Sequence, residues 1–311
     1  MLAACNADKP EMDVKLHACA AMPSARASAT CFVVDGQAYV FAGRDQNGRL
    51  LNDLWRYSPE TDTWDSICEA PMPPRVNATS CVHEDKVYLG LGFNGKHGRD
   101  SSYLREWWEY TPGTDTWRQL ANYPNHYTDD ATSFVGDGEL YVGYGFNWNY
   151  RRDMFRYTIA TNKWDSIDVH VAMHAYPLRS FGGTGCTCNK RHFMGTGYYR
   201  HSLDWWAEFD GKHWHERTPV PGKTRTLAAS AATEQYIYVT GGTHYGGVNT
   251  TGEVLADIRR YDPQTDHWTY VAVLPEGLIN HVCFTIGKRV FVGLGETEEW
   301  QVNDKLYWFE E

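Results

Sequence analysis

The chain has 311 residues, 22% of them charged, and a formal net charge of −10 at pH 7. An acidic chain is a poor partner for the phosphate backbone of a nucleic acid, which attracts basic surfaces. No apolar run approaches the roughly 20 residues that a membrane-spanning helix requires.

The first 13 residues form a separate segment. Residues 1–5, MLAAC, match the bacterial lipobox, in which a Cys after small residues is lipidated, and a polar stretch follows to residue 13. This pattern predicts lipidation of Cys5, a tether over residues 6–13 and a place in the bacterial cell envelope. A charged region and an apolar region do not precede the motif in this sequence, so a chance match at a frayed start is the alternative.

From residue 14 onwards the sequence repeats. Six strand-like runs of aromatic and β-branched residues each end in a Gly. These glycines are Gly43, Gly92, Gly145, Gly197, Gly242 and Gly295. A further strand pattern and a turn rich in Pro, Thr and Asp follow most of these runs, as in residues 54–62 and 258–266. Each repeat is therefore expected to contain several short strands separated by turns.

A tryptophan opens the last strand of each repeat. The five marker residues are Trp64, Trp117, Trp164, Trp214 and Trp268, which lie 47 to 54 residues apart, and each follows an aromatic residue by five to seven positions. A period near 50 indicates a toroidal repeat protein with four short strands in each unit. Six glycine markers but five tryptophan markers predict that the N-terminal strand supplies the missing strand and closes the ring.

The repeat resembles the kelch repeat. The similarity rests on the aromatic-to-Trp spacing, the Gly-ended strand and the Met-Pro joint that leads to Arg26 and Arg75. It implies an all-β fold: a six-bladed kelch-type β-propeller over residues 14–311, with the last blade closed by the N-terminal strand. The sequence departs from the family in its degenerate fourth repeat and in its strand ends, because only Gly241-Gly242 keeps the usual Gly pair.

The eight cysteines do not indicate a disulfide scaffold, because four of them recur at one place in the repeat, where they are interpreted as small buried packing residues. Cys31, Cys81, Cys186 and Cys283 each lie 11 or 12 residues before the strand-ending Gly, which predicts one shared position on the innermost strand. The Cys186-Thr-Cys188 pair near His192 lacks a second ligand pair and is a weak zinc signal. No metal or cofactor is expected.

The predicted ligand site is the mouth of the central channel. Residues at the repeat joints and in the loops after the strand-ending glycines are expected to meet on one face, and convergent polar and aromatic groups at a concavity favour binding. The proposed ligand-binding residues are Arg26, Arg44, Arg75, Asn94, His126, Asn147, Trp148, Arg179, Tyr198, Arg225, His244 and His281. A structural role for the joint arginines, in which they bind loop carbonyls of a neighbouring blade, is the alternative.

Three functions are compatible with this fold. The favoured one is an interaction propeller of the cell envelope that binds a glycan, an anionic small molecule, a peptide or a protein partner. The second is a mutarotase-like isomerase that acts on an acidic sugar such as sialic acid, with Glu296 and His244 as weak candidates for the acid and base. A galactose-oxidase-like copper enzyme is disfavoured, because that family uses seven blades and a Tyr/His copper site that this sequence does not supply.

Overall fold

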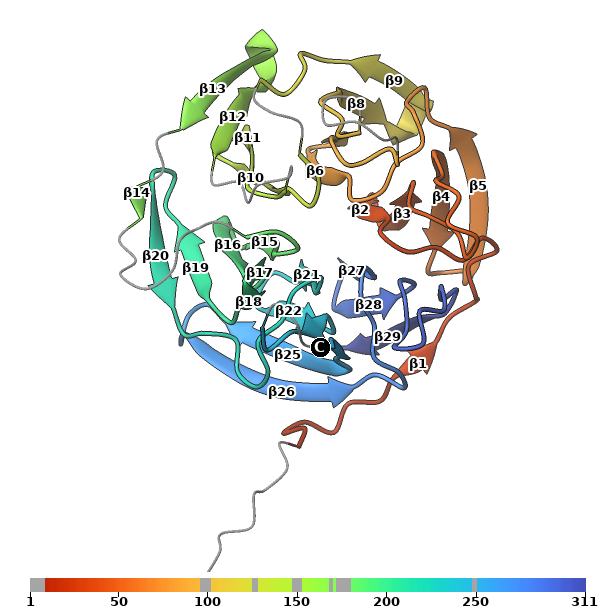
Figure 1. Cartoon of the computed structure of the whole chain (residues 1–311). Helices are drawn as coiled ribbons and strands as arrows, with labels where there is room; N and C mark the ends of the chain where they lie inside the picture. Colours follow the sequence, from red (N-terminus) through yellow and green to blue (C-terminus); the bar gives the residue numbers. More distant parts are fainter. Residues whose placement is uncertain are drawn as a thin grey trace, which may run out of the picture.

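Six antiparallel sheets stand around a central channel in the computed structural model of the chain (Figure 1), which describes residues 9–95, 102–124, 128–146, 153–167, 170–171, 180–247 and 251–311. The first strand of each sheet lies at the channel and the last lies at the rim. Blades 1 to 3 are β2 Thr30–Val34, β3 Gln37–Phe41, β4 Asp53–Ser58, β5 Thr63–Glu69; β6 Thr79–His83, β7 Lys86–Gly90, β8 Trp107–Thr111, β9 Thr116–Gln119; and β10 Thr132–Gly136, β11 Glu139–Gly143, β12 Met154–Thr158, β13 Lys163–Ile167. Blades 4 to 6 are β15 Thr184–Cys188, β16 Arg191–Gly195, β19 Trp206–Phe209, β20 His213–Arg217; β21 Ala229–Ala232, β22 Ile237–Thr240, β25 Asp257–Asp262, β26 His267–Val273; and β27 Val282–Ile286, β28 Arg289–Gly293, β29 Leu306–Glu310, β1 His17–Ala18. The predicted six-bladed fold is confirmed.

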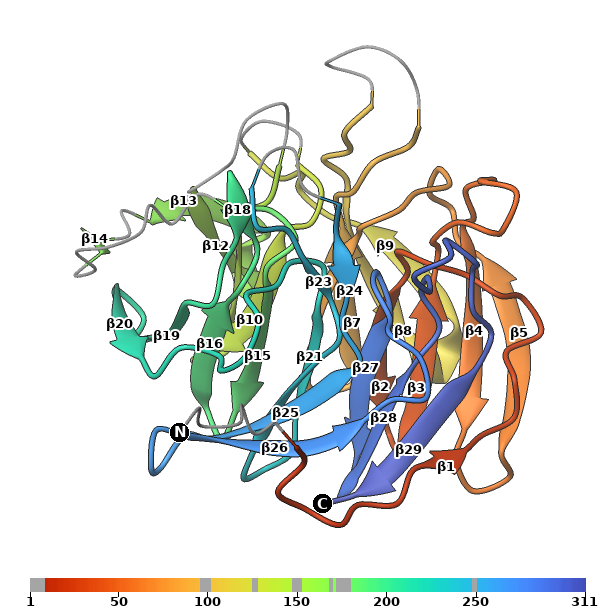
Figure 2. The same ribbon diagram turned by 60° about the horizontal axis from the view of Figure 1, so that its bottom comes forward.

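Several smaller elements accompany the strands of the six blades. In the fourth blade, β14 (His170–Val171) pairs with β20 in parallel. Two short hairpins, β17 (Tyr198–Tyr199) with β18 (His201–Ser202) and β23 (Thr243–His244) with β24 (Glu253–Val254), lie towards one face of the ring, whereas the C-terminus lies at the opposite face (Figure 2). Single 3-10 turns, η1 (Pro112–Thr114) and η2 (Ile159–Thr161), join the outer strands of blades 2 and 3.

The N-terminal strand completes the sixth blade, as the count of markers predicts. His17 lies opposite Trp308 and Ala18 opposite Tyr307 in an antiparallel pair, so both ends of the chain share one sheet (Figure 1). Pairing β1 with β29 removes an exposed sheet edge, which would otherwise be open to aggregation.

Contacts with the ring begin before residue 14. The backbone N–H of Glu11 donates to the carbonyl of Tyr270 at 2.8 Å, and the Glu11 carboxylate accepts from the N–H of Tyr270 at 3.0 Å. Met12 packs against the hydrophobic cluster shared by blades 5 and 6. The end of the predicted tether is thus attached to the propeller.

The aromatic and tryptophan markers hold successive blades together. The Tyr57 hydroxyl donates to Asp62 at 2.8 Å, and Asp62 also accepts the backbone N–H of Ala20 at 2.8 Å. The Trp64 indole N–H donates to the Ala20 carbonyl at 3.0 Å. Asp62 has a left-handed φ of 51°, which Asp tolerates better than most residues. Tyr157 with Trp164 and Tyr261 with Trp268 repeat this clamp, so the spacing read in the sequence is a device for joining blades.

The strand-ending glycines connect neighbouring blades at the channel. The N–H of Gly43 donates to the carbonyl of Arg75 in the next blade at 2.9 Å. A Cβ on Gly43 would lie 2.7 Å from the Ala27 carbonyl oxygen, and its φ is +97°. Backbones approach too closely here for a side chain, which is the physical reason for a Gly at this point in every repeat.

No helix in the described part of the chain is long and apolar enough to cross a membrane.

Candidate functional site

The channel mouth is formed by six residues in left-handed conformation, one from each blade just before its innermost strand. With φ between 49° and 61°, they are Ser28, Asn77, Asp130, Gly182, Leu227 and Asn280. Backbone N–H groups of Asn77, Asp130, Leu227, Asn280 and Ser28 donate to the carbonyl of the preceding blade's ring residue at 2.7 to 3.3 Å. We call these six residues the mouth ring. They surround a cavity of about 130 Å³, and a second cavity of about 220 Å³ continues between the innermost strands.

Joint residues and loops meet beside this ring. Isolated backbone bridges join Ala27 to Arg44 in blade 1 and Ile279 to Glu296 in blade 6, and the other four blades have equivalent bridges. We call the surface that carries the mouth ring and these loops the channel-mouth face.

His281 is the one large side chain in the layer below the mouth ring. The five equivalent positions hold small residues, namely Ala29, Ala78, Ala131, Gly183 and Ala228. His281 is only 6% exposed; its Nε2 lies 2.8 Å from the Thr240 hydroxyl, and its Nδ1 has no hydrogen-bond partner. Burial lowers the pKa of His281 to about 3, so the ring is neutral at physiological pH.

Gly241 makes room for this histidine. A Cβ at Gly241 would lie 2.8 Å from His281 Cε1 and 2.5 Å from the Leu278 carbonyl oxygen. The equivalent positions are also left-handed but carry side chains, as at Ala42 with φ 60° and Leu91 with φ 60°. The single Gly pair noted in the sequence is therefore explained by the residue across the blade interface.

The joint arginines do not face a ligand. Arg26 is fully buried, donates to Ser24 and Ala42 carbonyls at 3.1 and 3.0 Å, and pairs with both oxygens of Asp53 at 2.8 and 2.9 Å. Arg75 and Arg225 are equally buried and bind an equivalent carbonyl and an acidic side chain. The ligand-facing interpretation is thus wrong for these three residues, because their guanidinium groups are used to connect strands within the ring.

The joint in the other three blades is occupied by different residues from those predicted. Backbone bridges place Thr128, Ser180 and Leu278 at the positions of the joint arginines. The Thr128 hydroxyl donates to the Tyr144 carbonyl at 3.2 Å, which replaces the arginine contact with a shorter side chain. His281 lies three residues further along, directly before β27, and lines the channel-mouth cavity. His126 and Arg179 lie outside the described residues, as do Asn147, Trp148 and Cys5.

Arg44 is the candidate arginine that reaches solvent. Its side chain is 32% exposed, and its guanidinium lies 2.5 Å from the carboxylate of Glu296, which is 1% exposed. Asn280 of the mouth ring donates to the same carboxylate at 3.3 Å. Within the described chain, no further partner occupies the Arg44 guanidinium. The buried carboxylate therefore holds a partly exposed cation next to the channel mouth.

Aromatic side chains form the opposite part of this face. The ring centroids of Phe181 and Tyr198 lie 5.9 Å apart, and Tyr198 contacts Tyr245 at the same distance. His244 lies nearby in β23, where its Nδ1 is 2.9 Å from the Thr224 hydroxyl. Asn94 follows the blade 2 glycine, and its backbone N–H donates to the Ser102 carbonyl. His244 and Glu296, the predicted acid and base, belong to different blades, and Glu296 is engaged by Arg44.

The sequence analysis did not identify a pair of carboxyl groups at the channel mouth. Asp129 and Asp130 share the amide of Asn77, which lies 3.3 Å from an oxygen of each, and no cation contacts either one among the described residues. Burial raises the pKa of Asp129, and burial together with the neighbouring Asp129 charge raises that of Asp130. Asp130 lines the mouth cavity and so presents a carboxyl that retains a proton more readily than usual. In the sequence, the feature that could have indicated this pair is the presence of two adjacent acidic residues directly before an innermost strand.

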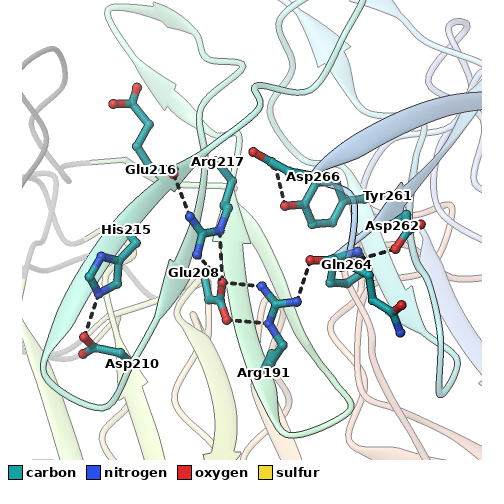
Figure 3. Close-up of polar contacts among 11 residues, drawn as sticks. Arg191, Glu208, Asp210, His215, Glu216, Arg217, Tyr261, Asp262, Gln264 and Asp266 are labelled. Atoms are coloured by element: carbon teal, nitrogen blue, oxygen red, sulfur yellow. Dashed lines mark hydrogen bonds and ion pairs between the residues drawn. The ribbon is translucent and has the colours of Figure 1, made fainter.

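A second polar cluster lies away from the channel in blade 4 and is internally satisfied (Figure 3). Arg191 donates to both oxygens of Glu208 at 2.6 and 2.7 Å, and Arg217 donates to the same carboxylate at 2.7 Å. The remaining donor of Arg191 binds the Pro263 carbonyl of blade 5. Because Glu208 and backbone carbonyls engage both guanidinium groups, the cluster connects two blades rather than forming a binding site.

The cysteines are free thiols throughout the described residues. Their predicted common position is only partly right. Strand register places Cys31 and Cys283 at one inner-strand position and Cys81 and Cys186 one residue later, on the other strand face. Burial raises the pKa of Cys31 and of Cys81 to about 12, so the thiolate form is disfavoured. Among the described residues, no three His, Cys, Asp or Glu side chains are grouped to hold a metal ion.

The sequence matches two kelch family models. Residues 5–197 match the KLHDC2/KLHL20/DRC7 Kelch-repeats domain, and residues 224–273 match the Kelch motif. The chain is 24% identical to Kelch-like protein 35 of Mus musculus over 326 residues, covering 97% of the chain and 52% of that protein. It spans about half the length of the Kelch-like relatives that it matches.

Two further matches cover most of this chain and most of the protein to which it is compared. The chain is 23% identical to N-acetylneuraminate epimerase of Shigella flexneri over 306 residues, covering 81% of the chain and 83% of that protein. The solved structure titled "Structure of YjhT" superposes with a TM-score of 0.76 at 16% identity, covering 92% of this chain and 95% of that one. The structural similarity supports the shared propeller fold.

Proposed function

Because the chain belongs to the Kelch-repeat family, we propose that it is a binding propeller that receives a glycan, a peptide or a protein partner on the channel-mouth face. The observation that carries this proposal is the partly exposed Arg44 guanidinium, held by buried Glu296 beside the polar mouth ring. The cavity of about 130 Å³ is smaller than pockets that enclose a whole drug-sized ligand. One end of the ligand would enter the mouth while the rest covers the surrounding loops.

A guanidinium with free donors favours an anionic group on that ligand. Arginine binds a carboxylate through two parallel hydrogen bonds, a geometry that lysine cannot reproduce. Arg44→Lys keeps a positive charge next to Glu296 and removes the fork, so it changes ligand geometry with little change in the buried ion pair.

The test is a thermal-shift screen of the protein against acidic sugars, neutral oligosaccharides and short acidic peptides. A ligand at about 100 times its Kd stabilises the folded state by about 2.7 kcal/mol. We expect an anionic ligand to raise Tm, and Arg44→Lys to reduce the rise without changing the Tm of the free protein. A ligand-induced rise that is the same in wild type and variant would exclude Arg44 from the site, and no rise in any class would contradict a small-ligand mouth.

A sugar mutarotase is the second candidate, because the match to the N-acetylneuraminate epimerase covers most of both chains. Opening a hemiketal requires a base that removes the proton of the anomeric hydroxyl group and an acid that protonates the ring oxygen as its bond to the anomeric carbon breaks. Asp130 is better placed to be the acid than Glu296, since it lines the mouth and its pKa is raised by burial and by Asp129. Anomer exchange of N-acetylneuraminate, followed by NMR, is expected to slow at least tenfold in Asp130→Asn. Equal exchange rates in the variant and in wild type would remove this candidate.

Attachment to a bacterial cell envelope through a lipid on Cys5 remains part of the proposal. Its support is the MLAAC motif. Mass spectrometry of the N-terminal peptide from a membrane fraction tests it: a diacylglyceryl-modified Cys5 supports anchoring, and an unmodified Cys5 contradicts it.

A further inference from the structure

Two adjacent loops on the channel-mouth face have the same backbone design. In blade 1, Arg44 bridges Leu50, and in blade 6, Glu296 bridges Val302, so each loop spans seven residues. The loops touch, because Arg44 pairs with Glu296 and the Gln46 side chain accepts the backbone N–H of Val302 at 2.6 Å. We call residues 296–302 the tryptophan loop.

Trp300 occupies the position of a glycine in the sister loop. The N–H of Gly48 donates to the Asp45 carbonyl at 3.0 Å, and the N–H of Trp300 donates to the Thr297 carbonyl at 3.0 Å. Both residues are left-handed, with φ of +77° for Gly48 and +60° for Trp300. Glycine adopts this conformation freely, whereas a bulky side chain there is an outlier that costs backbone energy.

Burial of the Trp300 side chain does not offset that backbone energy. Trp300 is 63% exposed, and the other tryptophans that the structure describes are buried or half-buried. Neither the backbone nor the core accounts for an indole at this place. Residues held in a costly backbone conformation are concentrated at functional sites, and an indole exposed at such a position points to a contact outside this chain.

The charges around the indole are negative. Glu298 and Glu299 precede Trp300 and are both exposed, and no partner engages their carboxylates among the described residues. Arg44 neutralises Glu296, so it leaves these two charges uncompensated. The sister loop has one further cation, the exposed Arg49, so the two loops together contain more carboxylates than guanidinium groups.

From this geometry we infer that Trp300, Glu298 and Glu299 form a docking site for an arginine or lysine side chain of a peptide or protein partner. The cation would lie over the indole face, as in other cation–π contacts, with the two carboxylates beside it. The inference rests on the proposed function in that it uses the same face, and it specifies the partner as one that presents a basic side chain. The contact of Gln46 with Val302 keeps the tryptophan loop fixed to blade 1.

The test follows the Trp300 indole N–H resonance, assigned by its absence in Trp300→Phe. The probe is N-acetyl-L-arginine amide, and the matched uncharged probe is N-acetyl-L-norleucine amide. We expect a saturable shift with the arginine probe at low ionic strength, at least threefold weaker binding in 0.5 M NaCl, and loss of the shift in Glu298→Gln/Glu299→Gln. An equal response to norleucine, or no response to arginine, would overturn the inference.

Two controls separate this site from a structural role and from the channel mouth. Trp300→Gly is expected to keep or raise Tm, because Gly suits the left-handed position; a marked fall in Tm would show that Trp300 stabilises the fold instead. Arg44→Lys is expected to leave arginine binding within twofold. A failed arginine titration in a protein whose mouth still binds an anionic ligand would remove only this inference, whereas loss of ligand binding at the mouth would remove the proposed function.

Discussion

The buried joint arginines carry a sharp prediction about stability, and blade 1 contains its own control. Arg26 has a fully buried side chain and pairs with Asp53 at 2.8 Å, whereas Arg56 pairs with Asp65 at 2.9 Å with side chains that are 38% and 50% exposed. The two pairs have nearly the same length and differ in burial. Replacing each arginine by Met therefore compares a buried arginine that binds both Asp53 oxygens and two carbonyls with a partly exposed arginine that makes one bond to Asp65.

Removing one partner of a buried pair usually costs about 3–5 kcal/mol, because the remaining charge is left uncompensated. Asp53 retains one donor, the Trp55 indole N–H at 2.6 Å, and is 25% exposed, so we expect a value near the lower limit. Arg26→Met should lower the free energy of unfolding by about 3 kcal/mol. Arg56→Met should lower it by about 0–1 kcal/mol, which is typical of exposed pairs.

Equilibrium urea unfolding followed by tryptophan fluorescence measures both values. The cost of Arg26→Met should persist in 1 M NaCl, since salt screens buried pairs weakly, whereas the small cost of Arg56→Met should vanish. If the two variants differ by less than about 1 kcal/mol, the reasoning that Arg26 connects the blade through its buried contacts is refuted. Blade 6 shows that a joint without this ion pair can fold, because Leu278 and Lys305 stand there in place of the arginine and the carboxylate.

Three further predictions follow from the titrating groups. The pKa of His281 is about 3 in the folded protein and about 6.5 in the unfolded chain, so the free energy of unfolding falls as pH falls below 6.5. Urea unfolding of His281→Gln should show a decrease between pH 7 and pH 5 that is smaller than in wild type by about 2 kcal/mol, and an unchanged decrease would contradict a buried neutral ring. Burial and the Asp129 charge raise the pKa of the Asp130 carboxyl, so the free energy of unfolding falls as pH rises. Asp130→Asn should be more stable than wild type at pH 8 and equal to it at pH 4. A variant that is less stable than wild type at pH 8 would show that the fold stabilises the charged carboxylate. The cysteine thiols that line the inner strands should react with Ellman's reagent at least a hundredfold more slowly in native protein than in urea, and fast native labelling of Cys31 would show that the inner strands open readily.

Local chemistry explains why the fold could be predicted from the sequence. A Tyr, a left-handed Asp or Asn five residues later, and a Trp must recur at fixed spacing, because together they clamp one blade to the next. The strand-ending Gly recurs because a Cβ there would meet a carbonyl oxygen of an adjacent segment. These requirements are satisfied within a few residues of chain, so they appear in the sequence as a period.

The candidate site depends on contacts that no local pattern contains. Arg26 and Arg44 are both arginines near a repeat joint, yet one is buried against Asp53 and the other is held at the surface by Glu296, a residue 252 positions away along the chain. The histidine in the channel and the glycine that admits it come from different blades. Trp300 looks like an ordinary member of an aromatic-rich chain until its loop is compared with the sister loop of blade 1. The sequence by itself determined the ring, because the repeat is local; tertiary structure decided which side chains face solvent, because exposure depends on what the neighbouring blade places opposite each one.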